Sequence, residues 1–217
     1  MVARKFDELQ RANPLRVVIS AFNELCAIIK KTSSDEELGA MYQQLTYSFG
    51  ASFSRVVQVL PNIVLLGLHH QTSMVSFERD DEIRSNSLTF ILQTLIRVIS
   101  SKEHPVLMFL DDLQWSDART CRVIADVLSD TKGSSCMLFV GAYRSNEVDA
   151  GHPLFEFVDK LKQGNVPLKK LHLNGMDRQE LHLMISDALK VMPRHCQDLA
   201  QTLYQKTNGS PLLTNGK

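Results

Sequence analysis

Apolar residues recur every three or four positions in several segments of the chain, the spacing that places them on one face of a helix. This pattern predicts helices over four long segments, residues 14–29, 85–99, 118–128 and 153–162. Asn13 and Pro14 suit the start of the first helix, as a cap and as a first-turn residue. Two weaker helical patterns lie at 36–47 and 53–60. Residues 61–81 show no clear period and are interpreted as a loop.

Unbroken apolar runs at 106–110 (VLMFL) and 137–142 (MLFVGA) predict two strands. Because polar residues do not alternate within them, each strand is expected to be buried on both faces, as strands of parallel sheets are. A third strand is predicted at 168–173, after the helix at 153–162. Two β-α-β crossovers then join three parallel strands. The predicted fold class is α/β, with a doubly wound parallel sheet.

The chain changes character near residues 174–176, after which only helical patterns follow. Asp177, with Glu180 three residues later, forms a start that resembles a capping box. We therefore predict two domains. The first is an α/β core over residues 1–174, and the second is the start of a small all-helical domain over residues 175–217.

Composition and charge are those of an ordinary globular protein. Apolar residues make up 44% of the chain and charged residues 22%, which argues against disorder. The 24 basic and 24 acidic side chains cancel, so no whole-molecule field favours nucleic acid.

No apolar run approaches the roughly 18 residues of a membrane span, and residues 1–10 lack the apolar core of a signal peptide. We expect a cytoplasmic protein without a membrane span.

Cysteines and histidines show no ligand spacing. The four cysteines lie far apart without a C-x-x-C pair, which indicates reduced, buried thiols rather than disulfides or a zinc site. His69 and His70 are adjacent, but no third ligand is close in sequence, so no metal site is predicted there.

The apolar run at 106–110 ends in two adjacent carboxylates, Asp111 and Asp112. In a doubly wound sheet, ligands bind outside the carboxyl ends of the strands. One carboxylate there can hold Mg²⁺ while its neighbour orients or deprotonates the water that attacks a phosphate. The pattern resembles the Walker B motif of P-loop ATPases. Paired acids at a strand end also occur as turns or helix caps and in receiver domains, but the further Asp, Thr and Lys of a receiver domain are not found.

Arg144 follows the next apolar run along the chain, so it is expected at the corresponding end of the neighbouring strand. The planar fork of an arginine there makes paired hydrogen bonds to phosphate oxygens, which suits the γ-phosphate of a nucleotide. The alternative is an arginine that neutralises Asp111 or Glu147.

Longer segments carry a closer resemblance. KFDELQRANPLRVVISAFNELCAII, HPVLMFLDDLQWSD, MLFVGAYRSNEV with GHPLFEFVDKL, and QKTNGSPLL together resemble the AAA-type ATPase domain, related to the STAND class and to origin-recognition-complex AAA domains. That domain occurs inside very large signalling proteins, which join it to protein-kinase-like, GAF and histidine-kinase domains. The resemblance extends over essentially the whole chain and is loosest at 61–85.

The resemblance implies an ATP- and Mg²⁺-dependent switch in signal transduction. It assigns Asp111 to the Mg²⁺ ion, Asp112 to the attacking water and Arg144 to sensing the γ-phosphate. Gly209 and Pro211 are similar to a lid motif whose proline approaches the adenine. Without the resemblance, Pro211 is interpreted as a first-turn residue of a helix.

The phosphate-binding loop of that family, G-x-x-x-x-G-K-[ST], does not occur in these 217 residues. The Gly-Lys pair at 216–217 is not followed by Ser or Thr. By the resemblance, the loop and the first strand precede residue 1, and residues 1–3 are the tail of the second strand. The first strand lies between the strand of Arg144 and the one at 168–173. The expectation is a truncated P-loop NTPase core with a gap of about 9–10 Å in its sheet, weak stability and little nucleotide binding by this chain alone.

A second hypothesis is a non-catalytic regulatory or protein-interaction module that has lost the loop. The missing loop favours it for the chain as given, whereas the retained Asp111, Asp112, Arg144 and Pro211 favour a fragment of a working ATPase. An in-frame phosphate-binding loop upstream would distinguish the two. The expected partners are a nucleotide and other domains of a larger signalling protein. No sequence feature indicates an oligomeric state.

Overall fold

The computed structural model describes residues 1–7, 13–67, 85–130 and 136–210. Contacts divide the chain into two compact units, Met1–Leu168 and Lys169–Lys217, here named the core unit and the helical unit. This division falls a few residues before the boundary predicted near 174–176. Each unit has its own cluster of buried apolar side chains.

The core unit contains a three-stranded parallel sheet in the order β1-β2-β3. The strands are β1 (Val2–Lys5), β2 (Val106–Asp111) and β3 (Met137–Gly141). Their register pairs Ala3 with Phe109, and Phe109 in turn with Val140. The predicted strands at 106–110 and 137–142 are confirmed. The α/β class, with a parallel sheet and a helical C-terminal part, is confirmed as well.

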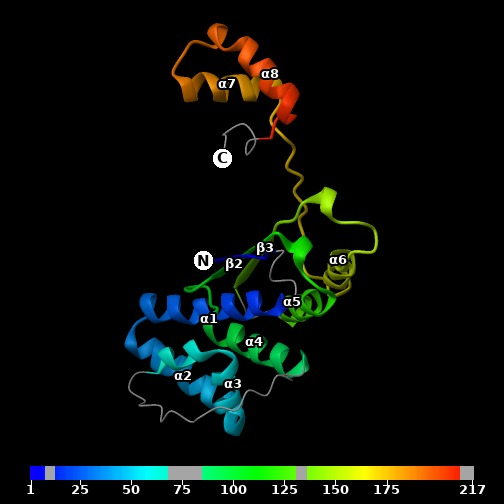
Figure 1. Ribbon diagram of the computed structural model, residues 1–217. Helices are drawn as coiled ribbons and strands as arrows, with labels where there is room; N and C mark the ends of the chain where they lie inside the picture. The colour runs from blue at the N-terminus through cyan, green and yellow to red at the C-terminus, as the bar shows by residue number, and fades with distance from the viewer. Residues whose placement is uncertain (8–12, 68–84, 131–135, 211–217) are drawn as a thin grey trace. The chain divides into compact units, whose positions relative to one another are not determined.

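Helices of the core unit lie beside the sheet and in a further layer beyond it (Figure 1). They are α1 (Leu15–Thr32), α2 (Asp35–Phe49), α3 (Phe53–Val59), α4 (Ser85–Ile99), α5 (Ala118–Asp130) and α6 (Pro153–Gln163). Short 3-10 helices lie between them, namely η2 (Gly50–Ser52), η3 (Pro61–Leu66), η4 (Leu113–Trp115) and η5 (Ser145–Glu147). The predicted cap at Asn13 is wrong, because the N-cap position of α1 is Pro14, which makes no side-chain cap hydrogen bond. Asn13 contributes its backbone carbonyl, which accepts a hydrogen bond from Arg16 N at 3.1 Å.

The loop predicted at 61–81 is wrong for its first residues. Residues 61–66 form η3, in which Ile63 and Leu66 are completely buried. Their apolar side chains pack with α1, α2 and α3. Burial therefore stabilises a 3-10 helix that the sequence periodicity did not predict. Residues 68–81, together with His69 and His70, lie outside the described residues.

One face of the sheet is packed against helices and the other is not. Val106, Met108 and Leu110 are buried, whereas Leu107 and Phe109, which point to the opposite face, are half-buried. On β3, Leu138 is 62% exposed. The prediction that both strands are buried on both faces is therefore wrong for the structure as described, because the described helices cover the face of Met108.

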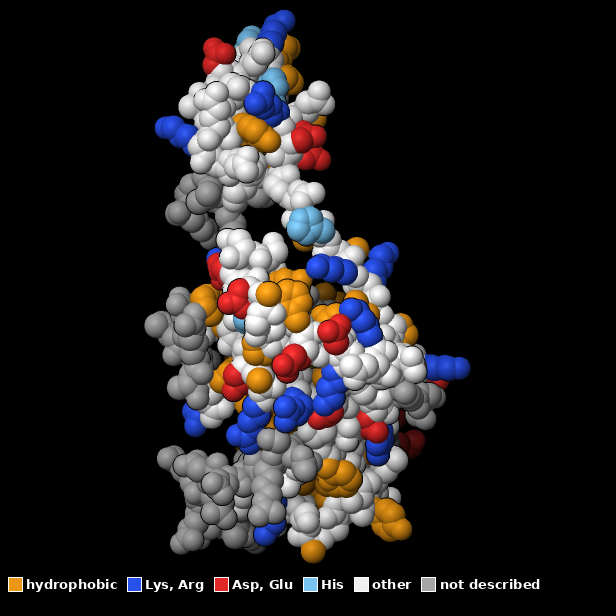
Figure 2. Space-filling model, turned by 90° about the vertical axis from the view of Figure 1, so that its right-hand side faces the viewer, with side chains coloured by type: hydrophobic (Ala, Val, Ile, Leu, Met, Phe, Trp, Pro, Cys, Tyr) orange, Lys and Arg blue, Asp and Glu red, His pale blue; other side chains and the backbone are white. Residues whose placement is uncertain are grey.

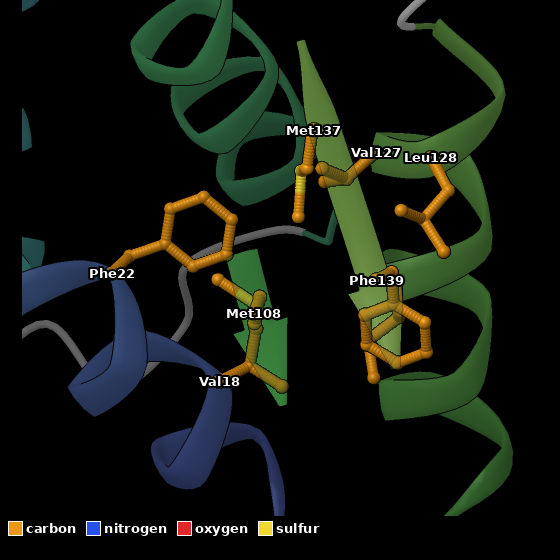
Figure 3. Close-up of a pocket in the computed structure, with 8 residues that line it drawn as sticks. Val18, Phe22, Met108, Val127, Leu128, Met137 and Phe139 are labelled. Carbon is orange, nitrogen blue, oxygen red and sulfur yellow. The ribbon is translucent and has the colours of Figure 1, made fainter. Parts of the chain in front are cut away.

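The covered face contains a small void between the strands and two helices. Its lining comes from α1, β2, α5 and β3, and includes Phe22, Met108, Val127 and Phe139, whose side chains point toward one another (Figure 3). The void measures about 10 Å³. Because there is room for no more than about one water molecule and the walls are apolar, the void is a dry packing gap rather than a ligand site.

The strand predicted at 168–173 is not formed. Residues 168–173 have no regular secondary structure, and Leu171 and Leu173 are 72% and 90% exposed. A strand requires hydrogen bonds to a neighbour, and in the described part of the sheet β3 is an edge strand, with β2 as its partner. The apolar residues at 168, 171 and 173 fit a strand but do not specify a neighbouring strand with which to pair.

The helical unit consists of α7 (Arg178–Leu189), η6 (Pro193–His195) and α8 (Gln197–Thr207). The predicted capping box is confirmed. Asp177 accepts a hydrogen bond from Glu180 N at 2.8 Å, and Glu180 accepts one from Asp177 N at 2.8 Å. The two helices bury Leu181, Ile185, Cys196 and Ala200 between them.

Three of the four cysteine side chains lie in the interior of the described structure. Cys26, Cys121 and Cys196 are buried, Cys136 is half-buried, and all four are free. Acidic and basic side chains are interspersed over the face of the core unit seen in Figure 2, without a broad patch of one sign. In the described part of the chain, no helix is both long and apolar enough to cross a membrane.

The start of α2 carries a contact that depends on pH. Ser34 and Glu37 form a capping box, in which Glu37 Oε2 accepts a hydrogen bond from Ser34 N at 2.8 Å. The other carboxylate oxygen of Glu37 lies 3.0 Å from His104 Nε2. The hydrogen bond from His104, followed by those from the backbone and hydroxyl of Ser34, lowers the pKa of Glu37 to about 2.

We expect acid to remove the stabilisation from Glu37. A carboxylate whose pKa is lower in the folded state stabilises the fold above its unfolded pKa, 4.5 here, and that contribution is lost as the pH falls towards about 2. Water and salt screen this exposed side chain, so the effect is modest. Urea unfolding at about pH 6 and about pH 3 should show a larger loss of stability in the wild type than in Glu37→Gln. Equal losses would contradict the assignment.

Candidate functional site

Asp111 and Asp112 stand at the carboxyl end of β2, as predicted. Asp111 ends the strand, and its carbonyl oxygen accepts a hydrogen bond from Phe6 N at 3.0 Å. Asp112 follows with φ 53° and ψ 45°, a left-handed conformation that Asp and Asn tolerate better than most residues. Leu113 N then donates to Ala142 O at 2.9 Å. The segments that follow β1 and β3 therefore fix the turn on which both acids stand.

The carboxylate of Asp112 is nearly buried and faces three polar partners. Its Oδ2 lies 2.8 Å from the Lys5 ammonium. Its Oδ1 accepts a hydrogen bond from Gln114 Nε2 at 3.2 Å and lies 3.7 Å from Arg144 Nε. The side chain of Asp112 is only 9% exposed, so these partners, rather than bulk water, supply most of its stabilisation as an anion.

Two opposing effects set the pKa of Asp112. Burial is the largest single effect and raises the pKa, because it disfavours the charged form. The hydrogen bonds from Lys5 and Gln114, with the positive charges of Lys5 and Arg144, together outweigh it, so the pKa of Asp112 lies below its usual value. The group is therefore an ionised carboxylate at neutral pH, able to accept a proton or to hold a cation.

Gln114 joins the ends of β2, β3 and α6. Its Nε2 donates to Asp112 and also to Glu147 Oε2 at 3.0 Å, and its Oε1 accepts a hydrogen bond from Arg144 N at 3.2 Å. Its backbone carbonyl accepts a hydrogen bond from His152 Nε2 at 3.0 Å, while His152 Nδ1 accepts one from Leu154 N. A single buried amide thus sets the spacing between the acids and the arginine.

Arg144 lies on the same rim of the sheet as the acids. Its Nη1 is 2.9 Å from Glu147 Oε1, and its Nε is 3.7 Å from Asp112 Oδ1. Hydrogen bonding and attraction to Glu147, followed by the charge of Asp112, raise the pKa of Arg144. The side chain is still 55% exposed. It therefore neutralises Glu147, the alternative left open by the sequence, and also presents part of its guanidinium to solvent beside Asp112.

Lys5 is a site residue that sequence reasoning missed. It is the last residue of β1 and lies opposite Asp111 in the sheet register. The available signal was its position at the end of a strand, since carboxyl ends of parallel strands meet at one edge. The expectation that residues 1–3 are the tail of a strand pointed to this strand, but did not reach its charged end.

The donor set at this edge suits a hard divalent cation. Mg²⁺ prefers oxygen ligands and is often held by one or two carboxylates together with water and substrate phosphates. Asp111 and Asp112 supply two carboxylates that both approach the same ammonium group, at 4.0 Å and 2.8 Å. Within the described residues, no group of three or more His, Cys, Asp or Glu side chains could hold a metal ion by itself. The residues fit a cation that is shared with phosphate oxygens.

A shallow groove of about 210 Å³ borders the cluster on the side of α1. Pro14, Gln114, Trp115, Ser116 and Asp117 line it. Gln114 connects this groove to the acid cluster, because its side chain also donates a hydrogen bond to Asp112.

Gly209 belongs to the helical unit and has φ 77°. Its carbonyl oxygen accepts a hydrogen bond from Met176 N at 2.9 Å, which closes the two-helix unit at its base. Pro211, the other residue predicted for a lid motif, lies outside the described residues. The structure thus shows a packing role for Gly209, and its predicted role towards a nucleotide stays a prediction.

The parallel sheet with its surrounding helices is consistent with part of the α/β core of P-loop NTPases. A model of the AAA ATPase domain family matches residues 1–140, and the chain belongs to that family. The chain is also 21% identical, over 272 aligned positions, to hybrid signal transduction histidine kinase G of Dictyostelium discoideum. That alignment covers 96% of this chain and 8% of the kinase, so the chain spans a small part of its relative. No solved structure matches the chain.

Proposed function

We propose that residues 1–217 form part of an ATP-binding, Mg²⁺-dependent AAA ATPase module that acts as a nucleotide-dependent switch in signal transduction. The observation that carries the proposal is the convergence of Asp111, Asp112 and Arg144 on one rim of the sheet, with Arg144 Nε 3.7 Å from Asp112 Oδ1. Paired acids and an arginine at the carboxyl ends of neighbouring parallel strands suit the binding of a triphosphate and its metal ion.

Each residue has a separate task in this proposal. Asp111, which is 37% exposed, holds Mg²⁺, whose charge neutralises the phosphates. Asp112, kept ionised in a nearly buried position, orients the attacking water and accepts its proton. Arg144 hydrogen-bonds the γ-phosphate with the exposed part of its guanidinium and turns away when that phosphate has left.

The phosphates of the nucleotide also need a cradle of backbone amides. We propose that a G-x-x-x-x-G-K-[ST] loop outside these 217 residues supplies it. The helical unit, with Gly209 and Pro211, acts as the lid. Membership in the AAA ATPase domain family supports this arrangement.

The surroundings proposed for the module follow from its relative and its thiols. The relative is a hybrid signal transduction histidine kinase, and we place this module beside other domains of a larger signalling protein. The free cysteines fit a reducing compartment, in agreement with a cytoplasmic location.

Arg144→Met tests the sensor assignment in the natural protein in which these residues occur. We expect the affinity for ATP to fall about tenfold, the effect of losing a hydrogen bond between charged groups, and the affinity for ADP to stay the same. Titration with both nucleotides in the presence of Mg²⁺ measures this. Arg97→Met, which removes an arginine paired with Asp130 on the surface, is the control. Equal losses for ATP and ADP would exclude Arg144 as a γ-phosphate sensor.

A further inference from the structure

Lys5 places its ammonium group between the two acids. Lys5 Nζ is 2.8 Å from Asp112 Oδ2 and 4.0 Å from Asp111 Oδ2. Its backbone is fixed on both sides, because Val2 is buried in the sheet and Phe6, 1% exposed, donates its N–H to Asp111 O. The lysine is therefore aimed at the acid pair by the sheet itself.

We propose that Lys5 is a positioning residue that substitutes for the divalent cation between Asp111 and Asp112 and sets how tightly the cation binds. The inference rests on the proposed function, which assigns these acids to a metal ion and an attacking water. Two adjacent carboxylates repel each other unless a positive charge lies between them. With Lys5 in place, both acids keep their positions before any metal arrives, and an arriving metal must displace the ammonium.

The chemistry of lysine suits a charge that has to leave. An ammonium is compact and strongly hydrated, and it sits on a flexible four-carbon stem. Lys5 is 62% exposed, so it can swing into water without uncovering the core. Asp112, in contrast, is held by its left-handed backbone and by Gln114. The mobile partner is therefore the lysine, and the fixed partner is the acid.

Arg4, the preceding residue, shows that this placement is specific. Its Nη1 pairs with Glu24 on α1 at 2.8 Å, and its Nε donates to Ser20 Oγ at 3.3 Å. It is a basic residue of the same strand that points away from the acids, because neighbouring side chains of a strand point to opposite faces. Arg4→Met is therefore a matched control for the removal of Lys5.

The test is a Mn²⁺ titration of the 217-residue chain without nucleotide, in which free Mn²⁺ is followed by its electron paramagnetic resonance signal. We expect Lys5→Met to bind Mn²⁺ about fivefold more tightly than the wild type, since one opposing charge is gone. Arg4→Met should bind like the wild type, and Lys5→Arg, which restores the charge, should reverse most of the gain. Without metal, Lys5→Met should melt at a lower temperature than the wild type, and Mn²⁺ should raise its melting temperature by more.

The possible outcomes separate this inference from the proposed function. Equal or weaker Mn²⁺ binding by Lys5→Met, with binding lost in Asp111→Asn, overturns the role of Lys5 and leaves Asp111 as the metal ligand. Absence of Mn²⁺ binding in both the wild type and Lys5→Met overturns the inference alone, because the acids then hold no cation without phosphate oxygens. Tighter binding in both Lys5→Met and Arg4→Met also overturns the inference. The gain in Mn²⁺ affinity would then come from the change in net charge and not from the position of Lys5.

Discussion

Asp112→Asn is expected to lower the rate of ATP hydrolysis by the natural protein about 100-fold or more, the usual contribution of a positioned proton acceptor. The asparagine keeps the shape of the side chain but cannot take a proton from water. Affinity for ATP should fall little, because phosphates and metal are held mainly by other groups. Single-turnover hydrolysis and nucleotide titration, measured on the same preparation, separate the two effects.

Asp112→Asn is expected to change the chemistry of the site without disturbing the fold around it. Asparagine tolerates the left-handed conformation that residue 112 adopts at φ 53°, so the turn after β2 should survive. Asp126→Asn is a matched control, since Asp126 is also an ion-paired aspartate, bound to Lys160, but lies on α5 away from the cluster. Turnover that is unchanged in Asp112→Asn removes the residue from the proposed mechanism. A protein that binds ATP and hydrolyses none before mutation favours the non-catalytic regulatory module.

The sequence predicted the site residues that stand at or directly after the ends of strands. An apolar run followed by Asp111 and Asp112 indicates both a strand and the side chains at its end. The same logic applied to the run before Arg144 placed the arginine on the same rim, and the 3.7 Å separation of Arg144 and Asp112 confirms the placement. Each inference needed only a local pattern and the rule that parallel strands end at one edge.

The part that could not be predicted depends on pairing between distant segments. Lys5 reaches Asp112 because β1 lies beside β2, and nothing in the first residues specifies that neighbour. Gln114 contacts four segments through its side-chain amide and its backbone carbonyl. A glutamine belongs to no sequence motif that would have predicted these contacts. The same limit produced the wrong strand at 168–173. Apolar residues there fit a strand, but a strand also requires a partner with free backbone groups.

Gly209→Ala is expected to destabilise the helical unit by about 2–4 kcal/mol, the cost of a strained backbone together with a steric clash. Gly209 has φ 77°, where an L side chain is strained, and an added Cβ would lie 2.0 Å from Met176 O. That oxygen is backbone and cannot rotate away. The hydrogen bond between Met176 N and Gly209 O would then break or lengthen, and α7 and α8 would lose the contact that closes their base.

Hydrogen exchange measured without nucleotide distinguishes this packing role from the predicted role of Gly209 in a lid. If packing dominates, amides of α7 and α8 lose protection in Gly209→Ala while those of β2 keep theirs. Gly151→Ala is the control, because its Cβ would meet only Asp149 Oδ1, at 3.7 Å. If Gly209 serves only a nucleotide, exchange stays unchanged and ATP affinity alone falls. Unchanged exchange would therefore contradict the packing role, because a 2.0 Å approach to backbone leaves no relaxed arrangement for alanine.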